Sequence, residues 1–203
     1  SNRLTGAQIN FPFVSVGATH VMMMAASLAD GQTIINNAAS EPEVMDVGRC
    51  LQAMGARIEG LGTRTLIIDG VEKLNGTTHT VIRDRIEAGA YACAAVVSNG
   101  EVTLTGADED LLGALAPVLQ QAGATFETKA DGLLVKGTSD IRPVNVVTEP
   151  YPGFATDLQA PFMGLMCVAD GVSHIKETIF ENRFMHVQEL ARLGADIQLQ
   201  GDT

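Results

Sequence analysis

The chain has 203 residues, which is enough for one or two domains with a hydrophobic core. Apolar residues make up 46% and aromatic residues only 4%, which predicts an aliphatic core. The formal net charge of −11 argues against a nucleic-acid-binding surface and against an anionic-membrane surface, because both require clustered positive charge. No apolar run approaches the length that spans a bilayer, so we expect neither a nucleic-acid nor a membrane partner.

The chain contains three cysteines, Cys50, Cys93 and Cys167, and no recognisable signal peptide. An odd number of scattered cysteines argues against a disulfide framework and is typical of a reducing compartment. Each cysteine stands in an apolar helical stretch, where a small buried hydrophobic residue is the simplest interpretation. These features predict a cytoplasmic protein.

Residues 18–29 form an almost uninterrupted run of small and apolar side chains, which predicts a helix that is buried nearly all round. A strand is expected at 33–35. The sequence Ser40-Glu41-Pro42-Glu43 has the spacing of a capping box with a proline in the first turn, so a second helix is expected to begin there. Residues 56–59 and 65–69 stand on either side of a glycine-rich turn, which predicts a hairpin.

A similar order of elements follows twice more along the chain. Pro117 lies inside the second helix of the second copy and should bend that helix or shift its start. Pro161 lies near the first turn of the first helix of the third copy. The expected elements are helices at 84–98 and 110–122, strands at 102–104, 125–128 and 133–135, a helix from 156, a strand at 173–176, a helix at 183–193 and a strand at 196–199.

A pair of glycines marks each of the three copies, one before a strand and one after the following helix. The glycines of a pair are 24, 23 and 23 residues apart. Such regularity indicates one iterated supersecondary unit that is too small to bury its own apolar faces. The units are therefore expected to pack on one another, with helices inside, sheets outside and a ligand where units meet. The pairs are Gly31 with Gly55, Gly100 with Gly123, and Gly171 with Gly194.

Polar segments precede the first helix of each copy. Ser15-Val16-Gly17-Ala18-Thr19 offers a hydroxyl, a glycine and free amides at a helix N-terminus, where the macrodipole favours anions. This pattern predicts a small phosphate cradle, with a simple helix cap as the alternative. In the third copy, Thr156 or Asp157 precedes the first helix, and a simple N-cap is again the alternative interpretation. Residues 177–186 contain more polar groups than a plain connection needs. The alternative interpretation is a salt-bridged, well-capped loop.

Together these segments resemble the UDP-N-acetylglucosamine enolpyruvyl transferases (UDP-N-acetylglucosamine 1-carboxyvinyltransferases). The resemblance covers nearly the whole chain in a single register and fits the middle and later part of the family's sequence, with both ends missing. Its most specific stretch is the last one. The matching stretches are Ser15-Val16-Gly17-Ala18-Thr19, Asn37-Ala38-Ala39-Ser40-Glu41-Pro42-Glu43, Asp84-Arg85-Ile86-Glu87-Ala88-Gly89, Thr156-Asp157-Leu158-Gln159-Ala160 and Thr178-Ile179-Phe180-Glu181-Asn182-Arg183-Phe184-Met185-His186.

The resemblance implies an α/β (α+β) fold of repeated βαβαββ units, truncated from an inside-out α/β barrel with two lobes of three units each. Residues 1–82 are then one unit of the first lobe, and residues 83–203 are two units of the second lobe, the last incomplete. The third copy stops at Thr203, where the other copies form a further strand, so an open sheet edge is expected. We therefore expect the chain to be part of a longer protein, with the active site in the cleft between lobes.

The family transfers the enolpyruvyl group of phosphoenolpyruvate to the 3-hydroxyl of the sugar in UDP-N-acetylglucosamine, and phosphate leaves. This reaction is the committed step of peptidoglycan precursor synthesis. Cell wall biogenesis, cell shape, the cell cycle and cell division are the processes linked to it. The implied partners are the two substrates and the remainder of the enzyme chain. No metal and no organic cofactor is implied. The isolated chain is expected to be inactive.

The resemblance also assigns roles to particular residues. Asp157 matches an aspartate proposed as the base for the sugar 3-hydroxyl, a role that suits a positioned carboxylate. Ile179 matches a position whose main chain holds the sugar nucleotide. Arg85 and Arg183 match cleft arginines, which are assigned to the anionic substrates. Three residues match contacts to the nucleotide diphosphate, namely Ser15, Val16 and Gly17.

The chain departs from the family at Phe13, where the family often has a lysine two residues before Ser15, and at Pro117 and Pro161. The family's reactive cysteine lies outside these residues. Two alternatives stay open: a non-catalytic sugar-nucleotide-binding or scaffold module of the same fold, and a 3-phosphoshikimate enolpyruvyl transferase. The acidic residue at 157 argues against the first alternative, and the stretch 178–186 argues against the second.

Overall fold

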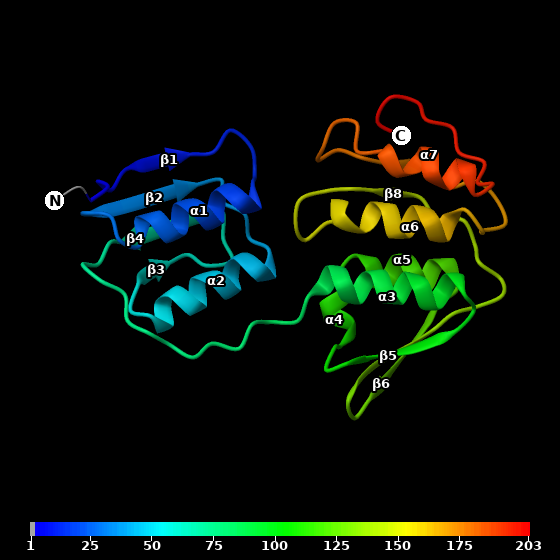
Figure 1. Cartoon of the computed structure of the whole chain (residues 1–203), viewed down its shortest axis with the longest axis horizontal. Helices are drawn as coiled ribbons and strands as arrows, with labels where there is room; N and C mark the ends of the chain where they lie inside the picture. Colours follow the sequence, from blue (N-terminus) through cyan, green and yellow to red (C-terminus); the bar gives the residue numbers. More distant parts are fainter. Residues whose placement is uncertain (1–2) are drawn as a thin grey trace. The chain divides into compact units, whose positions relative to one another are not determined.

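The computed structural model describes residues 3–203 and divides the chain into two compact units, unit 1 (Ser1–Ile82) and unit 2 (Arg83–Thr203) (Figure 1). Each unit has its own cluster of buried apolar side chains, so each is described by itself. Among the described residues, no helix combines the length and apolar character needed to cross a membrane.

Unit 1 consists of one four-stranded sheet and two helices, with sheet order β1-β2-β4-β3. Strands β1 and β2 run parallel, and β4 pairs antiparallel with both β2 and β3. The connection from β1 to β2 runs through α1, as a parallel pair requires. The elements are β1 (Gln8–Asn10), α1 (Val16–Ala26), β2 (Gln32–Asn36), α2 (Pro42–Ala53), β3 (Arg57–Glu59) and β4 (Thr65–Asp69).

The core of unit 1 lies between the sheet and its helices. Ile35 on β2 is paired with Leu66 on β4, and Ile58 on β3 is paired with Ile68 on β4. All four side chains are buried, because alternate residues of each strand point to the same face of the sheet. Met23 of α1 closes this core, which is aliphatic as the composition predicts.

Unit 2 contains two short sheets and the remaining helices. The first sheet has strand order β5-β7-β6 and is antiparallel, and the second is the parallel pair β8-β9. The elements are α3 (Arg85–Val97), β5 (Glu101–Thr105), α4 (Glu109–Leu112), α5 (Leu115–Ala122), β6 (Thr125–Lys129), β7 (Gly132–Lys136), β8 (Val146–Val147), the 3₁₀ helix η1 (Thr156–Leu158), α6 (Gln159–Met166), β9 (Ile175–Lys176) and α7 (Met185–Arg192).

The strand order repeats between copies, which confirms the repeated-unit fold. The antiparallel trio β2-β4-β3 of the first copy has the same order as β5-β7-β6 of the second. The parallel pair β1-β2 likewise corresponds to β8-β9 of the third copy. The second glycine of each copy, Gly55, Gly123 or Gly194, has a positive φ just after a helix. Glycine adopts this left-handed conformation without a steric penalty, so it ends the helix.

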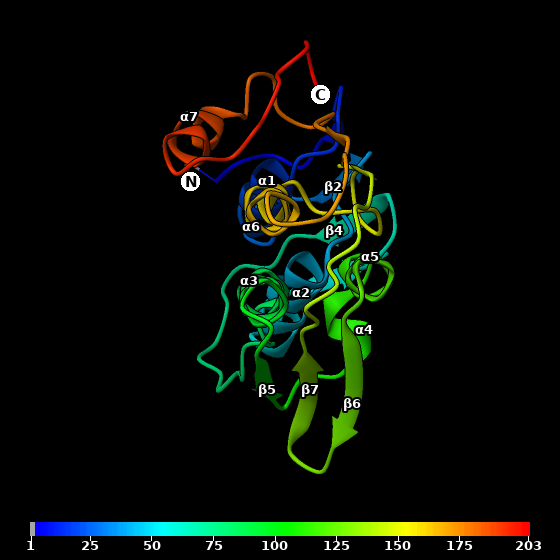
Figure 2. The same ribbon diagram turned by 90° about the vertical axis from the view of Figure 1, so that its right-hand side faces the viewer.

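The first helices of the second and third copies, α3 and α6, pack side by side (Figures 1 and 2). Gly89 makes this approach possible, because a Cβ there would lie 2.6 Å from Leu158 Cδ2 and 2.9 Å from Leu115 Cδ2. Phe162 of α6 is fully buried next to this contact and meets the ring of Phe154 edge-on at 5.6 Å. The N-terminal end of α3 therefore lies against η1, the segment that carries Asp157.

Three local predictions are wrong. Helix α1 is not buried all round, because its main contacts are with α2, β2 and β4, and Val21 on its other side is 56% exposed. The capping box at 40–43 is not formed, since the N-cap is Glu41 and its side chain makes no capping bond. Residues 196–199 form no strand, because within residues 3–203 no strand follows that could pair with them.

The proline and cysteine predictions have mixed outcomes. The helix expected at 110–122 is split into α4 and α5, and Pro117 stands in the first turn of α5, so its predicted effect is confirmed.

Cys93 is buried, and burial raises the pKa of its thiol to about 12. Cys50 and Cys167 are only half-buried, which corrects the expectation for these two positions. Burial also raises the pKa of the Cys167 thiol.

The contact between α3 and α6 predicts a large effect for Phe162→Ala. Removing a fully buried ring leaves a cavity, so the free energy of unfolding should fall by about 3–5 kcal/mol. Urea denaturation followed by circular dichroism measures this loss. The matched control is Val168→Ala, just beyond the same helix, which removes an exposed side chain and should change the free energy by less than about 0.5 kcal/mol. Equal, small losses in both variants would contradict the described packing.

Candidate active site

The N-terminus of α1 carries the first group of predicted site residues. Ser15 is the N-cap of α1, and its Oγ accepts a hydrogen bond from the Ala18 amide at 3.3 Å. Val16 is the first residue of the helix, and Gly17 is exposed. A Cβ on Gly17 would have no described atom within 4 Å. Packing within the chain therefore gives no reason for a glycine here. Phe13, two residues before the cap, is largely exposed.

Asp157 lies in η1 and forms an ion pair with Arg183. The Nη2 of Arg183 donates to Oδ1 of Asp157 at 2.7 Å, and its Nη1 donates to Oγ1 of Thr156 at 2.8 Å. The Asp157 side chain remains 54% exposed and the Arg183 side chain 39% exposed, so the pair lies at the surface of unit 2. Neither Thr156 nor Asp157 is a helix cap, since the N-cap of η1 is Ala155 and that of α6 is Leu158. The capping alternative for these two residues is therefore wrong.

Behind this pair lies Glu177, a carboxylate that is only 3% exposed. Its Oε1 accepts hydrogen bonds from Thr148 Oγ1 at 2.8 Å and from the amides of Ile179 at 2.8 Å and Phe180 at 3.1 Å. Its Oε2 accepts from Thr156 Oγ1 at 2.9 Å. A buried carboxylate is costly unless such donors satisfy it. These four donors satisfy Glu177 and tie three segments of unit 2 together.

The loop between β9 and α7 is held by its backbone as well as by its side chains. The Ile179 amide is engaged by Glu177, so a main-chain contact from this residue to a ligand falls to its carbonyl oxygen. The Arg183 guanidinium carbon lies 5.2 Å from the centre of the Phe180 ring, a cation–π arrangement. The Arg183 carbonyl accepts a hydrogen bond from Gln159 Nε2 at 3.2 Å. Arg183 is therefore fixed at both its backbone and its side chain.

Arg85 is the first residue of α3, immediately after the N-cap Asp84. Its guanidinium carbon lies 5.8 Å from the centre of the Tyr151 ring. Tyr151 belongs to the loop that joins β8 to η1. Since α3 also packs against η1, Arg85 lies at the same end of the helix pair as Asp157.

The structure thus brings Asp157, Ile179 and Arg183 into one hydrogen-bonded network in unit 2, with Arg85 at the same end of the helices. The diphosphate residues predicted at the start of α1 belong to unit 1 and form a separate group. No role for Glu177 or Thr148 was predicted from the sequence. A signal was present, because both follow short strands at positions that alternation points inward. A charged residue at such a position indicates a buried polar network.

Burial lowers the pKa of the His186 imidazole, and the positive charge of Arg183 lowers it further. The Nε2 atom of His186 is buried and has no hydrogen-bond partner among the described residues. His186 follows Phe184, and the two ring centres are 6.5 Å apart. Both effects favour the neutral imidazole over its protonated form.

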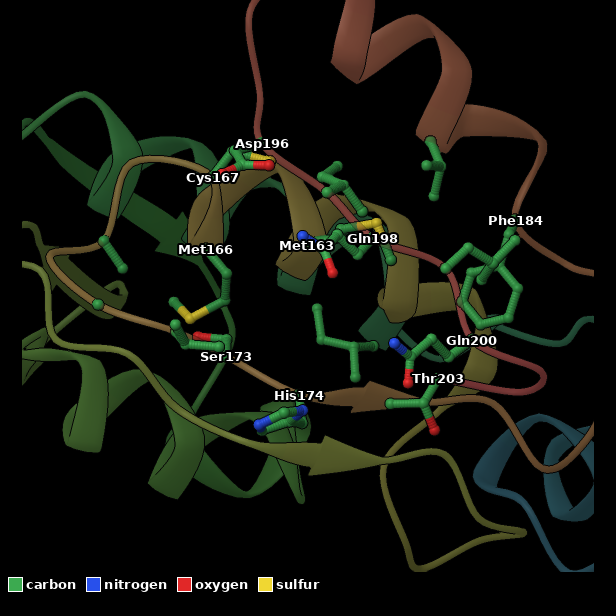
Figure 3. A pocket seen from close by; sticks show the side chains of 17 residues that line it. Met163, Met166, Cys167, Ser173, His174, Phe184, Asp196, Gln198, Gln200 and Thr203 are labelled. Atoms are coloured by element: carbon green, nitrogen blue, oxygen red, sulfur yellow. The ribbon is translucent and has the colours of Figure 1, made fainter.

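A cavity of about 800 Å³ opens elsewhere in unit 2, between α6, β9, α7 and the last residues of the chain (Figure 3). None of the seven site residues predicted from the sequence lines this cavity. It lies beside the segment 196–199, which was expected to be a strand and is not. Within residues 3–203, no three His, Cys, Asp or Glu side chains gather to hold a metal ion. The candidate active site is therefore the exposed network around Asp157.

The EPSP synthase family, described as 3-phosphoshikimate 1-carboxyvinyltransferase, matches the sequence over residues 1–203. The chain belongs to this family. Among its curated relatives, the UDP-N-acetylglucosamine 1-carboxyvinyltransferase of Allorhizobium ampelinum is 61% identical over 98% of this chain and 47% of its own length. The Brucella ovis protein of the same name is 57% identical over the whole chain and 47% of its own length. The chain therefore spans about half the length of these relatives.

Solved structures agree with this membership of the EPSP synthase family. The enolpyruvyl transferase NikO from Streptomyces tendae superposes with a TM-score of 0.85 at 26% identity, over 100% of this chain and 51% of that one. The EPSP synthase from Acinetobacter baumannii gives 0.69 at 19% identity, over 98% of this chain and 48% of that one, which supports the fold alone. The resemblance and the fold class predicted from the sequence are confirmed.

The lowered pKa of His186 predicts a pH-dependent stability. The unfolded chain binds more protons than the folded chain in the range just below the ordinary imidazole pKa of about 6.5, so the free energy of unfolding falls as the pH is lowered through this range. His186→Gln removes this contribution and should reduce the stability difference between about pH 7.5 and about pH 5.5. Urea denaturation at the two pH values measures it. Met185→Ala, an exposed change on the same helix, should keep the full difference, and an unchanged difference in His186→Gln would contradict the assignment.

Proposed function

We propose that this chain forms part of a UDP-N-acetylglucosamine enolpyruvyl transferase. The reaction moves the enolpyruvyl group of phosphoenolpyruvate to the 3-hydroxyl of UDP-N-acetylglucosamine and releases phosphate. The observation that carries this proposal is the exposed carboxylate of Asp157, held by Arg183 on a rigid polar network. The names of the relatives, which are 57–61% identical in the two cases described, support the same reaction.

Asp157 is the group that we assign as the general base. An alcohol is a weak nucleophile at neutral pH, and a positioned carboxylate can take its proton as the new C–O bond forms. The guanidinium of Arg183 binds Oδ1 of Asp157, so we assign Oδ2 as the atom that accepts the proton. Because Arg183 fixes the orientation of the carboxylate, the base does not have to be ordered when the substrate arrives.

The arginines are assigned to the phosphorylated substrates. The whole chain has a formal net charge of −11, so binding two anionic substrates requires local positive charge. Arg85 and Arg183 supply that charge at one end of the α3–α6 pair. A guanidinium also matches the geometry of phosphate oxygens, to which it can donate two hydrogen bonds.

The N-terminus of α1 is assigned to the nucleotide diphosphate. The first amides of a helix have no partner within the helix, and the macrodipole favours an anion there. The open space beside Gly17 supports this role, because a diphosphate approaches amides most closely where no Cβ intervenes. Ser15 and Val16 flank this space. In unit 2, the Ile179 carbonyl is assigned to the sugar nucleotide.

This function places the protein in peptidoglycan precursor synthesis, with the cytoplasm as its site and cell shape and division as the processes that depend on it. Two other functions make different predictions. A non-catalytic sugar-nucleotide-binding module would bind UDP-N-acetylglucosamine without turnover. A 3-phosphoshikimate enolpyruvyl transferase would use shikimate 3-phosphate as the acceptor, which the names of the 57–61% identical relatives argue against.

Asp157→Asn tests the base assignment in the full-length enzyme that carries these residues. Turnover should fall by about two orders of magnitude or more, because an amide cannot accept the proton, while UDP-N-acetylglucosamine binding should weaken much less. Phosphate release measured with each of the two acceptors also identifies the substrate. The matched control is Asp131→Asn, in the exposed turn between β6 and β7, which should leave turnover unchanged. If Asp157→Asn had normal turnover, the proposed role of this carboxylate would be refuted.

The isolated 203-residue chain should bind UDP-N-acetylglucosamine weakly or not at all. It spans about half the length of its relatives, and we propose that groups outside these residues complete the substrate site. Calorimetric titration of the isolated chain measures this, with the full-length enzyme as the positive control. Tight binding by the isolated chain would show that the site has been misplaced.

A further inference from the structure

The carboxylate of Glu177 lies at the centre of the network that holds the proposed base, although it does not touch that base. A chain of three hydrogen bonds leads from Glu177 Oε2 through Thr156 Oγ1 and Arg183 to Asp157, with lengths of 2.9, 2.8 and 2.7 Å. The other oxygen, Oε1, binds the backbone amides of the loop that carries Arg183. One buried group therefore restrains both the loop and the base.

The direction of each hydrogen bond in this chain is determined by the chemistry of its groups. Arg183 has only donors, so Thr156 Oγ1 must accept from it. The single hydroxyl proton of Thr156 is then donated to Glu177. Glu177 thus holds the Thr156 hydroxyl with a lone pair facing Arg183. Without an acceptor at Glu177, this hydroxyl is free to rotate, and one of the two anchors of the guanidinium is weakened.

We propose that Glu177 is a positioning residue, which sets the orientation of Arg183 relative to Asp157 through Thr156. This proposal rests on the proposed function of Asp157 as the base. It assigns Glu177 a role beyond filling the interior, because its Oε2 serves only the link to Thr156 among the hydrogen bonds described. Positioning of this kind affects the rate of the chemical step more than substrate affinity, since small displacements of a catalytic group are costly.

Glu177→Gln tests this role with little change of shape. A glutamine oxygen in the place of Oε1 keeps the three donors there, while its NH₂ group faces Thr156 and cannot accept the hydroxyl proton. The opposite amide orientation would turn the NH₂ group toward three donors and is disfavoured. The variant therefore removes the acceptor of the Thr156 hydroxyl proton, since the NH₂ group can only donate to Thr156 Oγ1, and it leaves the loop bonded. Thr156→Val removes the hydroxyl itself, and Thr156→Ser restores it.

In the full-length enzyme, Glu177→Gln and Thr156→Val should each lower kcat by about 10- to 100-fold, with KM for UDP-N-acetylglucosamine changed by less than about threefold. The double variant should be no worse than the poorer single variant, because Oε2 of Glu177 acts on Arg183 only through the Thr156 hydroxyl, which Thr156→Val already removes. Thr156→Ser should keep most of the activity. Glu189→Gln, an exposed change of the same type on α7, is the matched control and should keep normal kcat.

The outcomes separate the two proposals. If Asp157→Asn lowers turnover and Glu177→Gln does not, the positioning role is refuted and the proposed function stands. If Asp157→Asn has normal turnover, the proposed base role of Asp157 fails. The position of Arg183 is then decided by NMR of its guanidinium in the 203-residue chain. Slow guanidinium rotation that becomes fast in both Glu177→Gln and Thr156→Val supports the link, and unchanged rotation in these variants overturns it.

Discussion

The close contact between α3 and α6 is the constraint on which the organisation of unit 2 depends. Neither helix has a polar face wide enough to be solvated alone, and Gly89 lets them approach to the distance at which a single Cβ would clash with Leu158. Because the helices lie side by side with η1 at the start of α6, the N-terminal end of α3 is held next to Asp157. Asp157 and Arg85 are thereby carried on packed helices, which hold side chains more firmly than an unsupported loop does.

A second constraint acts behind these helices. Glu177 is almost completely buried, and a carboxylate in such a place requires donors from several directions. Those donors come from the segment after β8, from η1 and from the loop after β9, so satisfying one charge joins the region 148–156 to a loop more than twenty residues further along the chain. The exposed ion pair between Asp157 and Arg183 would be worth little by itself in water. Its fixed geometry comes from the buried network that supports it.

The fold could be predicted in large part because its signals are local. Helix breaks at Gly55 and Gly123, the hairpins and the threefold repeat follow from backbone preferences of a few neighbouring residues. The failures are also physical. The burial of α1 and the absence of a strand at 196–199 depend on which elements pack against these segments, and no local pattern contains that information. For the same reason, the residues at 40–43 have the spacing of a capping box but do not form its hydrogen bonds.

The sequence by itself determined the repeated unit, the family, the residue types that suit an anionic substrate and most of the helix and strand order, since each of these is written in short stretches of chain. The strands β1 and β8 were not predicted, because each is very short and exists through its pairing with a distant strand. Only the tertiary structure decided that Asp157 is paired rather than capping a helix, that Arg85 stacks on Tyr151, and that Glu177 supports the network. Hydrogen bonds between residues more than twenty positions apart depend on distances that arise only when the helices and strands have packed.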